Sequence, residues 1–499
     1  MSQNKKQVAL IILDGWGHRE DTEHNAIVQA QTPYFDLIWN TFPRTLLNAG
    51  EEYVGLPKGQ VGNSEIGHTT IGAGTIIDTD LVRIAKAIED QSFHSNKALL
   101  DLISHVNIND SALHVMGLLG TGGVHSHDDH LYAFLKLAKD KGIKKCFVHV
   151  FTDGRDSGPY DALESMMSLQ KICDELEFGK IASVSGRFFA MDRDSNWDRL
   201  QKFEDHVFEC KNGICQIAPL DEIKRQYEGG KTDEHIEPFS ITEAPLQQND
   251  GVFVFNFRAD RARMITQRLC AKKQELNLKI TTLTEYQKDF DVDVAFPPRI
   301  IKTTLAQEVS NAKLKQVHIA ETEKFPHATY FLNGGKEDPH EGEEHVVLAS
   351  RKDVQTHDEA PEMRAESIAD EAIIKINAGI DFIFINFANP DMVGHTANIP
   401  AIITAVETVD RELARVCEAI HARGGHVIVT ADHGNAEVNM NTTTGDIHTA
   451  HTLNQVPCII TNTQNLIQFE GGSLQDLAPT TLHLLGLKIP QEMTGKSLI

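Results

Sequence analysis

The chain has 499 residues, of which 41% are hydrophobic and 7% aromatic, a globular composition that excludes a disordered or fibrous protein. Its 71 acidic and 47 basic side chains give a formal net charge of -24, which excludes nucleic acid and anionic membranes as partners over most of the surface. The length exceeds one ordinary domain and predicts two large ones, and an anionic substrate would need a local cationic pocket.

The N-terminal segment and the cysteines indicate a cytoplasmic location. Two lysines precede the apolar run Val8 to Leu13, as in a secretion signal, but this run is short and ends at Asp14. No stretch approaches the roughly 20 apolar residues that span a bilayer. The seven cysteines include no C-x-x-C pair, which is typical of reduced cytosolic thiols.

Short apolar runs alternate with helical patterns along the whole chain. We expect strands within residues 7–13, 111–119, 144–152, 180–186, 251–257, 381–387, 425–430 and 456–460. Strands that alternate with helices predict an α/β fold with largely parallel sheets. Residues 229–230 and 333–335 read as turns, and the pair Pro297-Pro298 precedes a strand-like segment, residues 300–306. We therefore expect the chain to cross between domains near residue 300.

Several predicted strands end directly in polar, glycine-rich clusters. These clusters are Asp14-Gly15, Asp153-Gly154, residues 391–395 and residues 432–434. In open α/β sheets ligands bind beyond the carboxyl ends of the strands, so we expect the chemistry at these points.

The last third of the chain offers metal-binding side chains in three such clusters. Asp391 and His395 are four residues apart, which places both on one side of a helical turn. Asp432 and His433 are adjacent and need a loop to converge, and His448 and His451 follow in HTAHT. A single Asp or His of this kind usually faces solvent or caps a helix. Three clusters favour a site for Mn²⁺ or Zn²⁺, without the cysteines of a closed structural zinc site.

Ser64, in KGQVGNSEIGHTTIGAG, is the candidate nucleophile. Free N–H groups at a helix start would hold a phosphoryl group, and a bound metal would activate the hydroxyl. Alternatively Ser64 only caps the helix, and Asp14 only makes a turn. If both residues join the C-terminal ligands, the chain leaves this domain after residue 78 and returns near residue 302, with an inserted domain between.

The middle of the chain places arginines in loops after strand-like runs, namely Arg155, Arg187, Arg193, Arg258 and Arg261. Guanidinium groups bind phosphate and carboxylate in a bidentate manner, so these residues would form the cationic pocket. The alternative is structural pairing with neighbouring carboxylates, namely Asp156, Asp192, Asp194 and Asp260. The histidines of GTGGVHSHDDH present a similar choice, because His125 either donates to phosphate or chelates a metal with the others.

Over essentially its full length the chain resembles the cofactor-independent phosphoglycerate mutases of the alkaline-phosphatase-like superfamily. The shared motifs, in order, are LDGWG, VGNSEIGH, FTDGRD, GRFFAMDRD, NFRADRAR, EKFPHATYFLNGG, NFANPDMVGHT and TADHGNAE. Ser157-Gly158 and Ala397 depart from the usual pattern and affect loop shape. The resemblance implies an α/β fold: an alkaline-phosphatase-like, metal-binding domain with a mainly parallel sheet (residues 1–78 and 302–499), interrupted by an inserted α/β substrate-binding domain (residues 79–301).

The resemblance also implies a site and a mechanism. Two divalent ions, Mn²⁺ with Zn²⁺ or Co²⁺ as alternatives, would be bound by Asp391, His395 and His451 and by Asp14, Ser64, Asp432 and His433. Substrate would be bound by His125, Arg155, Asp156, Arg187, Arg193, Arg258, Arg261 and Lys324, with Asp156 also a proton shuttle. Ser64 would carry the phosphoryl group between 3-phosphoglycerate and 2-phosphoglycerate without bisphosphoglycerate, in a monomer.

Two other classes of function remain open on the sequence. One is a metal-dependent phosphatase or sugar-phosphate mutase on the same catalytic domain, which has less need of arginines that hold a small carboxylate. The other is a non-catalytic phosphoglycerate sensor, which would need neither Ser64 nor a full set of metal ligands.

Overall fold

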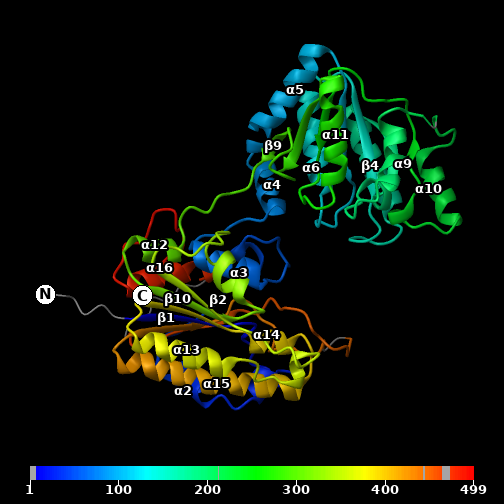
Figure 1. Ribbon diagram of the computed structural model, residues 1–499. Coiled ribbons are helices and arrows are strands. Elements are labelled where there is room, and N and C mark those ends of the chain that lie inside the picture. Colours follow the sequence, from blue (N-terminus) through cyan, green and yellow to red (C-terminus); the bar gives the residue numbers. More distant parts are fainter. Residues whose placement is uncertain (1–6, 212, 442–443, 464–471) are drawn as a thin grey trace. The chain divides into compact units, whose positions relative to one another are not determined.

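The computed structural model describes residues 7–211, 213–441, 444–463 and 472–499. The chain forms two compact units (Figure 1). The first unit comprises Met1–Thr79 and Ile300–Ile499, and the second comprises Asp80–Arg299. The first unit is therefore built from both ends of the chain. Within the described part of the chain, no helix combines the length and apolar character that a membrane crossing requires.

The first unit contains a seven-stranded sheet in the order β11-β10-β12-β1-β13-β14-β2. The strands are β11 (Glu343–Leu348), β10 (Gln316–Glu321), β12 (Phe382–Phe387), β1 (Val8–Leu13), β13 (His426–Thr430), β14 (Val456–Ile460) and β2 (Arg44–Leu47). The first five are parallel, and β14 runs antiparallel to both β13 and β2. Every residue of β1 and β12 is buried, and all of them are apolar except Asn386, as expected in a sheet covered on both faces.

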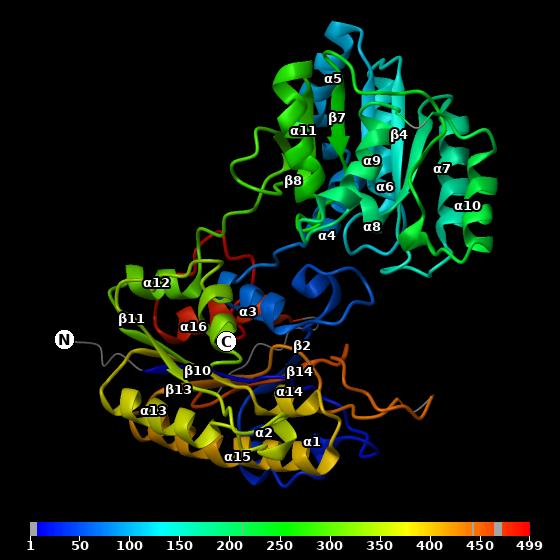
Figure 2. The ribbon, with the colours of Figure 1, turned by 45° about the vertical axis from the view of Figure 1, so that its right-hand side comes forward.

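Helices cover both faces of this sheet. Figures 1 and 2 show α2 (Pro33–Thr41), α13 (Ala365–Asn377) and α15 (Ile399–Ala422) on one face. On the other face lie α3 (Ser64–Ala73), α12 (Leu305–Asn311) and α16 (Leu477–Leu484). The short helices α1 (Ala26–Gln29) and α14 (Asn389–Gly394) pack against α15. This packing orders the loops at the carboxyl ends of the central strands.

The second unit has its own seven-stranded sheet, in the order β6-β5-β4-β3-β7-β8-β9. Its strands are β6 (Phe239–Ser240), β5 (Lys180–Gly186), β4 (Cys146–Thr152), β3 (Leu113–Leu118), β7 (Gly251–Val254), β8 (Lys279–Thr284) and β9 (Asp293–Phe296). All neighbours are parallel except β5 and β6.

Alternate side chains of these strands enter two separate apolar clusters, as expected when successive residues point to opposite faces. Along β3, Leu113 and Val115 join one cluster, and Met116 and Leu118 join the other. The first cluster includes side chains of α5 (Lys97–Asn109), α6 (Asp128–Asp140), α7 (Ala162–Leu176) and α10 (Pro219–Glu228). The second includes side chains of α9 (Trp197–Val207) and α11 (Arg263–Leu276). This unit also contains α4 (Asp80–Glu89) and α8 (Arg187–Ala190).

The prediction of an α/β fold with largely parallel sheets is confirmed, and each of the eight predicted runs contains a strand. The prediction for residues 300–306 is wrong, because no strand forms there and α12 begins at Leu305. Thr304 caps that helix, and its hydroxyl accepts a hydrogen bond from the backbone N–H of Gln307 at 3.2 Å. The apolar residues followed by two threonines fit a strand as well as the start of a helix. The Thr304 cap favours the helix.

Candidate active site

Three buried carboxylates follow three adjacent strands of the first unit. Asp14 comes directly after β1, Asp391 lies in α14 just beyond β12, and Asp432 follows β13. The strands lie side by side in the order β12-β1-β13, so their carboxyl ends meet at one edge of the sheet. None of the three residues is more than 2% exposed. The parallel topology therefore gathers side chains that are up to 418 residues apart in the sequence (14 and 432).

Asp391, His395 and His451 form the first donor group, in which one donor atom of each residue lies within 4.8 Å of the others. The Nε2 atoms of His395 and His451 both lie 3.3 Å from Asp391 Oδ1. Their Nδ1 atoms face the carbonyl oxygens of Thr449 (2.7 Å) and Gly62 (2.8 Å). Backbone acceptors of this kind hold the proton on Nδ1 and leave the Nε2 lone pair for a metal.

Asp14, Asp432 and His433 form the second donor group, and all three are fully buried. His433 Nε2 lies 3.5 Å from both Asp14 Oδ1 and Asp432 Oδ2. Asp432 and His433 converge although they are adjacent, because β13 ends at Thr430 and the chain is no longer extended. His448 is in neither donor group, and its Nδ1 faces the carbonyl oxygen of Val438 at 3.3 Å.

Ser64 lies beside the second donor group. Its Oγ is 3.0 Å from His433 Nε2 and 3.3 Å from Asp14 Oδ1. Ser64 is the first residue of α3, and the preceding Asn63 is the cap, with its side chain accepting from the Ile66 N–H. The alternative in which Ser64 is only a cap is therefore wrong. Because Asn63 caps the helix, the Ser64 hydroxyl is available for chemistry.

Lys324 connects the two donor groups. Its Nζ lies 2.8 Å from Asp14 Oδ1, 2.7 Å from Asp391 Oδ2 and 2.6 Å from Ser64 Oγ. Burial opposes a charge on this side chain, but Asp14 and Asp391 outweigh it and raise the pKa of Lys324 above its ordinary value. The lysine is therefore an ammonium that contacts the candidate nucleophile.

The carboxylates themselves are held in different electrostatic states. Burial opposes ionisation of Asp391, but the Lys324 ammonium holds its pKa well below the ordinary value. His433 and then His68 likewise overcome burial and lower the pKa of Asp432. Burial, and then the Asp432 carboxylate, raise the pKa of Asp14.

These side chains fit divalent cations. Asp14, Asp391 and Asp432 are buried together, and the Lys324 ammonium pairs with the first two, which leaves an excess of negative charge away from water. Asp432 Oδ2 is buried, and its neighbours among the described residues are the His68 and His433 rings, at 3.3 and 3.5 Å. Mixed carboxylate and imidazole donors are ligands that Mn²⁺, Zn²⁺ and Co²⁺ accept.

Three further residues orient the donor groups, and they are not among the residues predicted from the sequence. His68 Nδ1 lies 2.8 Å from the Ser64 carbonyl oxygen and 3.3 Å from Asp432 Oδ2. Asn386 donates to Asp14 Oδ2 at 2.8 Å, and Asn435 donates to Asp391 Oδ1 at 3.2 Å. A signal for Asn386 was available, because it is a polar residue inside the otherwise apolar run FIFINF.

A second set of predicted residues gathers within the second unit, in loops after β3, β4, β5 and β7. Arg187 Nη1 donates to both Asp153 Oδ1 and Asp156 Oδ2 at 2.5 Å. Asp260 pairs with Arg193 (3.0 Å) and Arg258 (3.3 Å). The two predicted alternatives were a cationic pocket and structural ion pairs. Both are partly present, because ion pairs with carboxylates hold the arginines in a common cluster.

Arg155 and Arg261 complete this cluster. Arg155 lies 3.6 Å from Glu234, and Arg261 donates to the Met191 carbonyl oxygen at 3.1 Å. Burial, and then the positive charges of Arg187, Arg193 and Arg155, lower the pKa of Arg261. Among the described ion pairs, neither Asp192 nor Asp194 pairs with one of the predicted arginines. Asp192 instead contacts Arg199 at 2.9 Å. Cationic groups therefore outnumber the carboxylates that contact them, which suits an anionic ligand.

His125 lies between two acidic members of this cluster. Its Nε2 is 3.7 Å from Asp156 Oδ2, and its Nδ1 is 3.5 Å from Asp260 Oδ1. Burial, and then the Arg187 guanidinium, lower the pKa of His125 to about 4. The ring is consequently neutral at physiological pH and has an N–H to donate. His125 is in none of the metal-donor groups found among the described residues.

The low pKa of His125 predicts how stability changes with pH. The ring of an unfolded chain has a pKa near 6.5, so between about pH 6.5 and 4 the unfolded state binds more protons than the folded state. The free energy of unfolding should therefore fall as the pH drops through this range. We expect the His125 ring to remain neutral at about pH 5.5 in an NMR titration of the folded protein.

The variant His125→Gln lacks this titrating ring and should lose less stability over the same pH range. The exposed His483 provides a matched control, because His483→Gln should keep the wild-type dependence. A His125 ring that becomes protonated near pH 6.5 in the folded protein would contradict the prediction.

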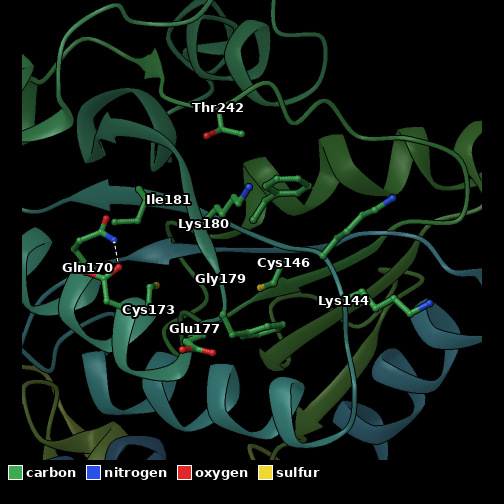
Figure 3. Close-up of a pocket in the computed structure, with 13 residues that line it drawn as sticks. Lys144, Cys146, Gln170, Cys173, Glu177, Gly179, Lys180, Ile181 and Thr242 are labelled. Atoms are coloured by element: carbon green, nitrogen blue, oxygen red, sulfur yellow. Dashed lines mark hydrogen bonds between the residues drawn. The ribbon is translucent and has the colours of Figure 1, made fainter.

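A separate cavity of about 620 Å³ in the second unit contains none of the predicted site residues. Figure 3 shows its lining, which includes Lys144, Cys146 and Lys180. Cys146 and Lys180 begin β4 and β5, whereas the arginine cluster follows the carboxyl ends of these strands. The cavity thus lies at the opposite end of the sheet from the predicted substrate residues.

The mainly parallel sheet of the first unit, with carboxylate and histidine donors around one serine hydroxyl, defines an enzyme of the alkaline-phosphatase-like class. Residues 274–472 match the family model described as type I phosphodiesterase / nucleotide pyrophosphatase. Residues 84–288 match the model of the N-terminus of BPG-independent PGAM.

Full-length relatives define the family more narrowly. The chain is 44% identical to the 2,3-bisphosphoglycerate-independent phosphoglycerate mutase of Francisella philomiragia subsp. philomiragia and 45% identical to that of Listeria monocytogenes serotype 4b, with 99% of each chain covered. Leishmania mexicana phosphoglycerate mutase, crystallised at low cobalt concentration, is 27% identical with a TM-score of 0.60, over 99% of this chain and 97% of that one. The chain belongs to the family of 2,3-bisphosphoglycerate-independent phosphoglycerate mutases, which are isomerases.

Proposed function

We propose that this enzyme interconverts 3-phosphoglycerate and 2-phosphoglycerate through a phosphoserine at Ser64, with two divalent ions and without bisphosphoglycerate. One observation carries the mechanism: the Ser64 hydroxyl lies within 3.3 Å of Asp14, His433 and Lys324 at once. A serine in a purely structural role does not need an ammonium and two metal-type donors around its oxygen. We further propose a cytoplasmic monomer, with metal binding in residues 1–78 and 302–499 and substrate binding in residues 79–301.

The proposed metal ligands are the two donor groups, with Ser64 added to the second. One ion would be held by Asp391, His395 and His451, and the other by Asp14, Ser64, Asp432 and His433. Bound Mn²⁺, our first choice, supplies Lewis-acid charge that favours ionisation of the Ser64 hydroxyl and offsets charge on phosphate oxygens. Lys324 then holds a non-bridging phosphate oxygen with its ammonium, an interaction that strengthens as negative charge develops there.

The Ser64 hydroxyl gives up its proton to solvent before the reaction, so that its oxygen is ionised at the beginning and at the end of the cycle. In the first half-reaction, this oxygen forms a bond to phosphorus, and the bond from phosphorus to the O3 oxygen of 3-phosphoglycerate breaks. The departing oxygen takes a proton, for which Asp156 is the proposed donor. In the second half, the O2 hydroxyl of the same glycerate loses its proton to Asp156 and attacks the phosphoserine. The Ser64–phosphorus bond then breaks, and 2-phosphoglycerate leaves. Protons and phosphoryl groups balance over the cycle.

The arginine cluster favours a mutase over a phosphatase on the same catalytic domain. The bidentate geometry of guanidinium suits the glycerate carboxylate, which must be retained between the two half-reactions. We assign this role to Arg155, Arg187, Arg193, Arg258 and Arg261. His125, which is neutral, buried and flanked by Asp156 and Asp260, donates its N–H to the substrate. A phosphatase releases the alcohol and gains nothing from such retention.

The test uses the metal-loaded full chain with 3-phosphoglycerate alone. We expect 2-phosphoglycerate, detected through enolase, and no free phosphate above background. Treatment with a chelator should reduce the rate by at least about 10³-fold, and added Mn²⁺ should restore it, because the uncompensated carboxylates repel the phosphate. Release of phosphate in place of 2-phosphoglycerate would favour the phosphatase, and full activity in chelator would refute the metal mechanism.

A further inference from the structure

A third group of metal-type donors lies at one edge of the first unit's sheet and shares no residue with the candidate active site. His318 is on β10, and Glu343 and His345 are on the edge strand β11. His318 pairs with His345 in the parallel register, and Glu343 is two residues from His345, so all three point to the same face. One donor atom of each residue lies within 4.8 Å of the other two.

The surroundings hold these side chains in place. The Glu343 side chain is fully buried, and its Oε1 lies 2.7 Å from Asn333 Nδ2 and 2.6 Å from His345 Nε2. Its Oε2 accepts from the backbone N–H of His340 at 2.8 Å. His318 Nδ1 faces the carbonyl oxygen of Ala328 at 2.8 Å. Contacts of this kind are the outer-sphere partners that orient metal ligands.

The group also has unused donor capacity and suitable charges. His318 Nδ1 lies 3.4 Å from Glu343 Oε1 and 2.8 Å from the Ala328 carbonyl oxygen. The other ring nitrogen, Nε2, is buried and has no hydrogen-bond partner among the described residues. Burial lowers the pKa of His318 to about 4, so its ring is neutral. Burial opposes ionisation of Glu343, but His345 and then His318 lower its pKa to about 2. A neutral imidazole and an anionic carboxylate are the forms that bind a metal.

We propose that His318, Glu343 and His345 form an additional site for a divalent ion of the zinc class. Two imidazoles and one carboxylate are a donor set that zinc accepts, with a water molecule as the fourth ligand. The alternative is a network of hydrogen bonds that never takes up an ion.

An ion at this position would have a structural consequence. It would link the edge strand β11 to β10. As an edge strand, β11 is held by a neighbouring strand on one side only. The intervening chain also contributes, since Ala328 and Asn333 both contact the group. Lys324 lies four residues before Ala328, so the ion would stabilise the segment that positions this lysine.

The test counts Zn²⁺ per full-length chain by elemental analysis after equilibration with excess Zn²⁺ and removal of free ion. We expect wild type to retain one more Zn²⁺ per chain than His345→Gln. His345 is largely buried at the sheet edge, and the exposed His483 gives the matched control His483→Gln, which should retain as many ions as wild type. Because the active-site residues are identical in all three proteins, their occupancy cancels in the comparison.

Equal counts in wild type and His345→Gln would overturn the proposal, whatever the result for the mutase reaction. A second measurement does not depend on the variant folding. Anomalous diffraction from wild-type crystals grown with Zn²⁺ should show a peak bounded by His318, Glu343 and His345. Ordered side chains without a peak would overturn the proposal as well.

Discussion

Replacing Ser64 by alanine should reduce the mutase rate by at least about 10⁴-fold, because removal of a covalent nucleophile causes rate losses of this size. The hydroxyl is the only part of the side chain that is removed, and its contacts are Asp14, His433 and Lys324. Asp14 and His433 are proposed metal ligands and Lys324 is an ammonium without a free lone pair, so none of them can take over the phosphoryl group. The enolase-coupled rate with saturating 3-phosphoglycerate measures the effect.

The control for this variant is Ser95→Ala, because Ser95 is exposed in the second unit and should leave the rate unchanged. Labelled phosphate from substrate should be trapped on wild-type protein after rapid denaturation and be absent from Ser64→Ala. A Ser64→Ala enzyme with wild-type activity would refute the phosphoserine route, and label on another residue would move the nucleophile elsewhere.

Replacing Lys324 by methionine should lower kcat by about 10² to 10³-fold, the range for losing one group that stabilises charge in the transition state. Methionine keeps an unbranched apolar chain and removes only the ammonium. In the variant Asp14 and Asp391 lose their shared cation, so the pKa of Asp391 should rise from its depressed value. Steady-state kinetics with 3-phosphoglycerate at saturating Mn²⁺ measures the loss.

The matched control is Lys313→Met, since the Lys313 side chain is 71% exposed and pairs only with the surface residue Glu341 in the described ion pairs. We expect its kcat to equal that of wild type. A Lys324→Met enzyme whose KM rises while kcat stays constant would mean that the lysine binds ground state and transition state equally, contrary to the proposed role.

Local sequence patterns were enough to predict the strands and the ends at which chemistry would occur. Val8 to Leu13 is an unbroken apolar run, and Phe382 to Phe387 is interrupted only by Asn386, because both faces of a parallel sheet are covered. Asp14 comes directly after the first run and Asp391 four residues after the second, so both lie at the carboxyl edge by topology alone. The i and i+4 spacing of Asp391 and His395 predicted their meeting, because one helical turn brings such residues to the same side.

Local patterns did not predict the structure of segments whose residues fit two local structures equally well. Residues 300–306 have an apolar start and β-branched threonines, which fit a strand, yet the Thr304 cap makes them the approach to α12. Ser64 suited an N-cap as well as a nucleophile, and only the position of Asn63 separates the two. In both cases a single capping hydrogen bond determines the local structure, and the residue types alone do not predict which residue makes it.

The sequence by itself determined the α/β class, the strands and the polar residues at their ends, since these depend on the order of neighbouring side chains. Only the tertiary structure decided that Lys324 contacts Ser64, Asp14 and Asp391, and that His318 meets Glu343 and His345. The physical reason is that these contacts depend on strand order. Along the chain the strands follow as β1, β10, β12 and β13, whereas in the sheet they lie in the order β10-β12-β1-β13. Residues far apart in the sequence therefore become neighbours, which a local sequence pattern cannot predict.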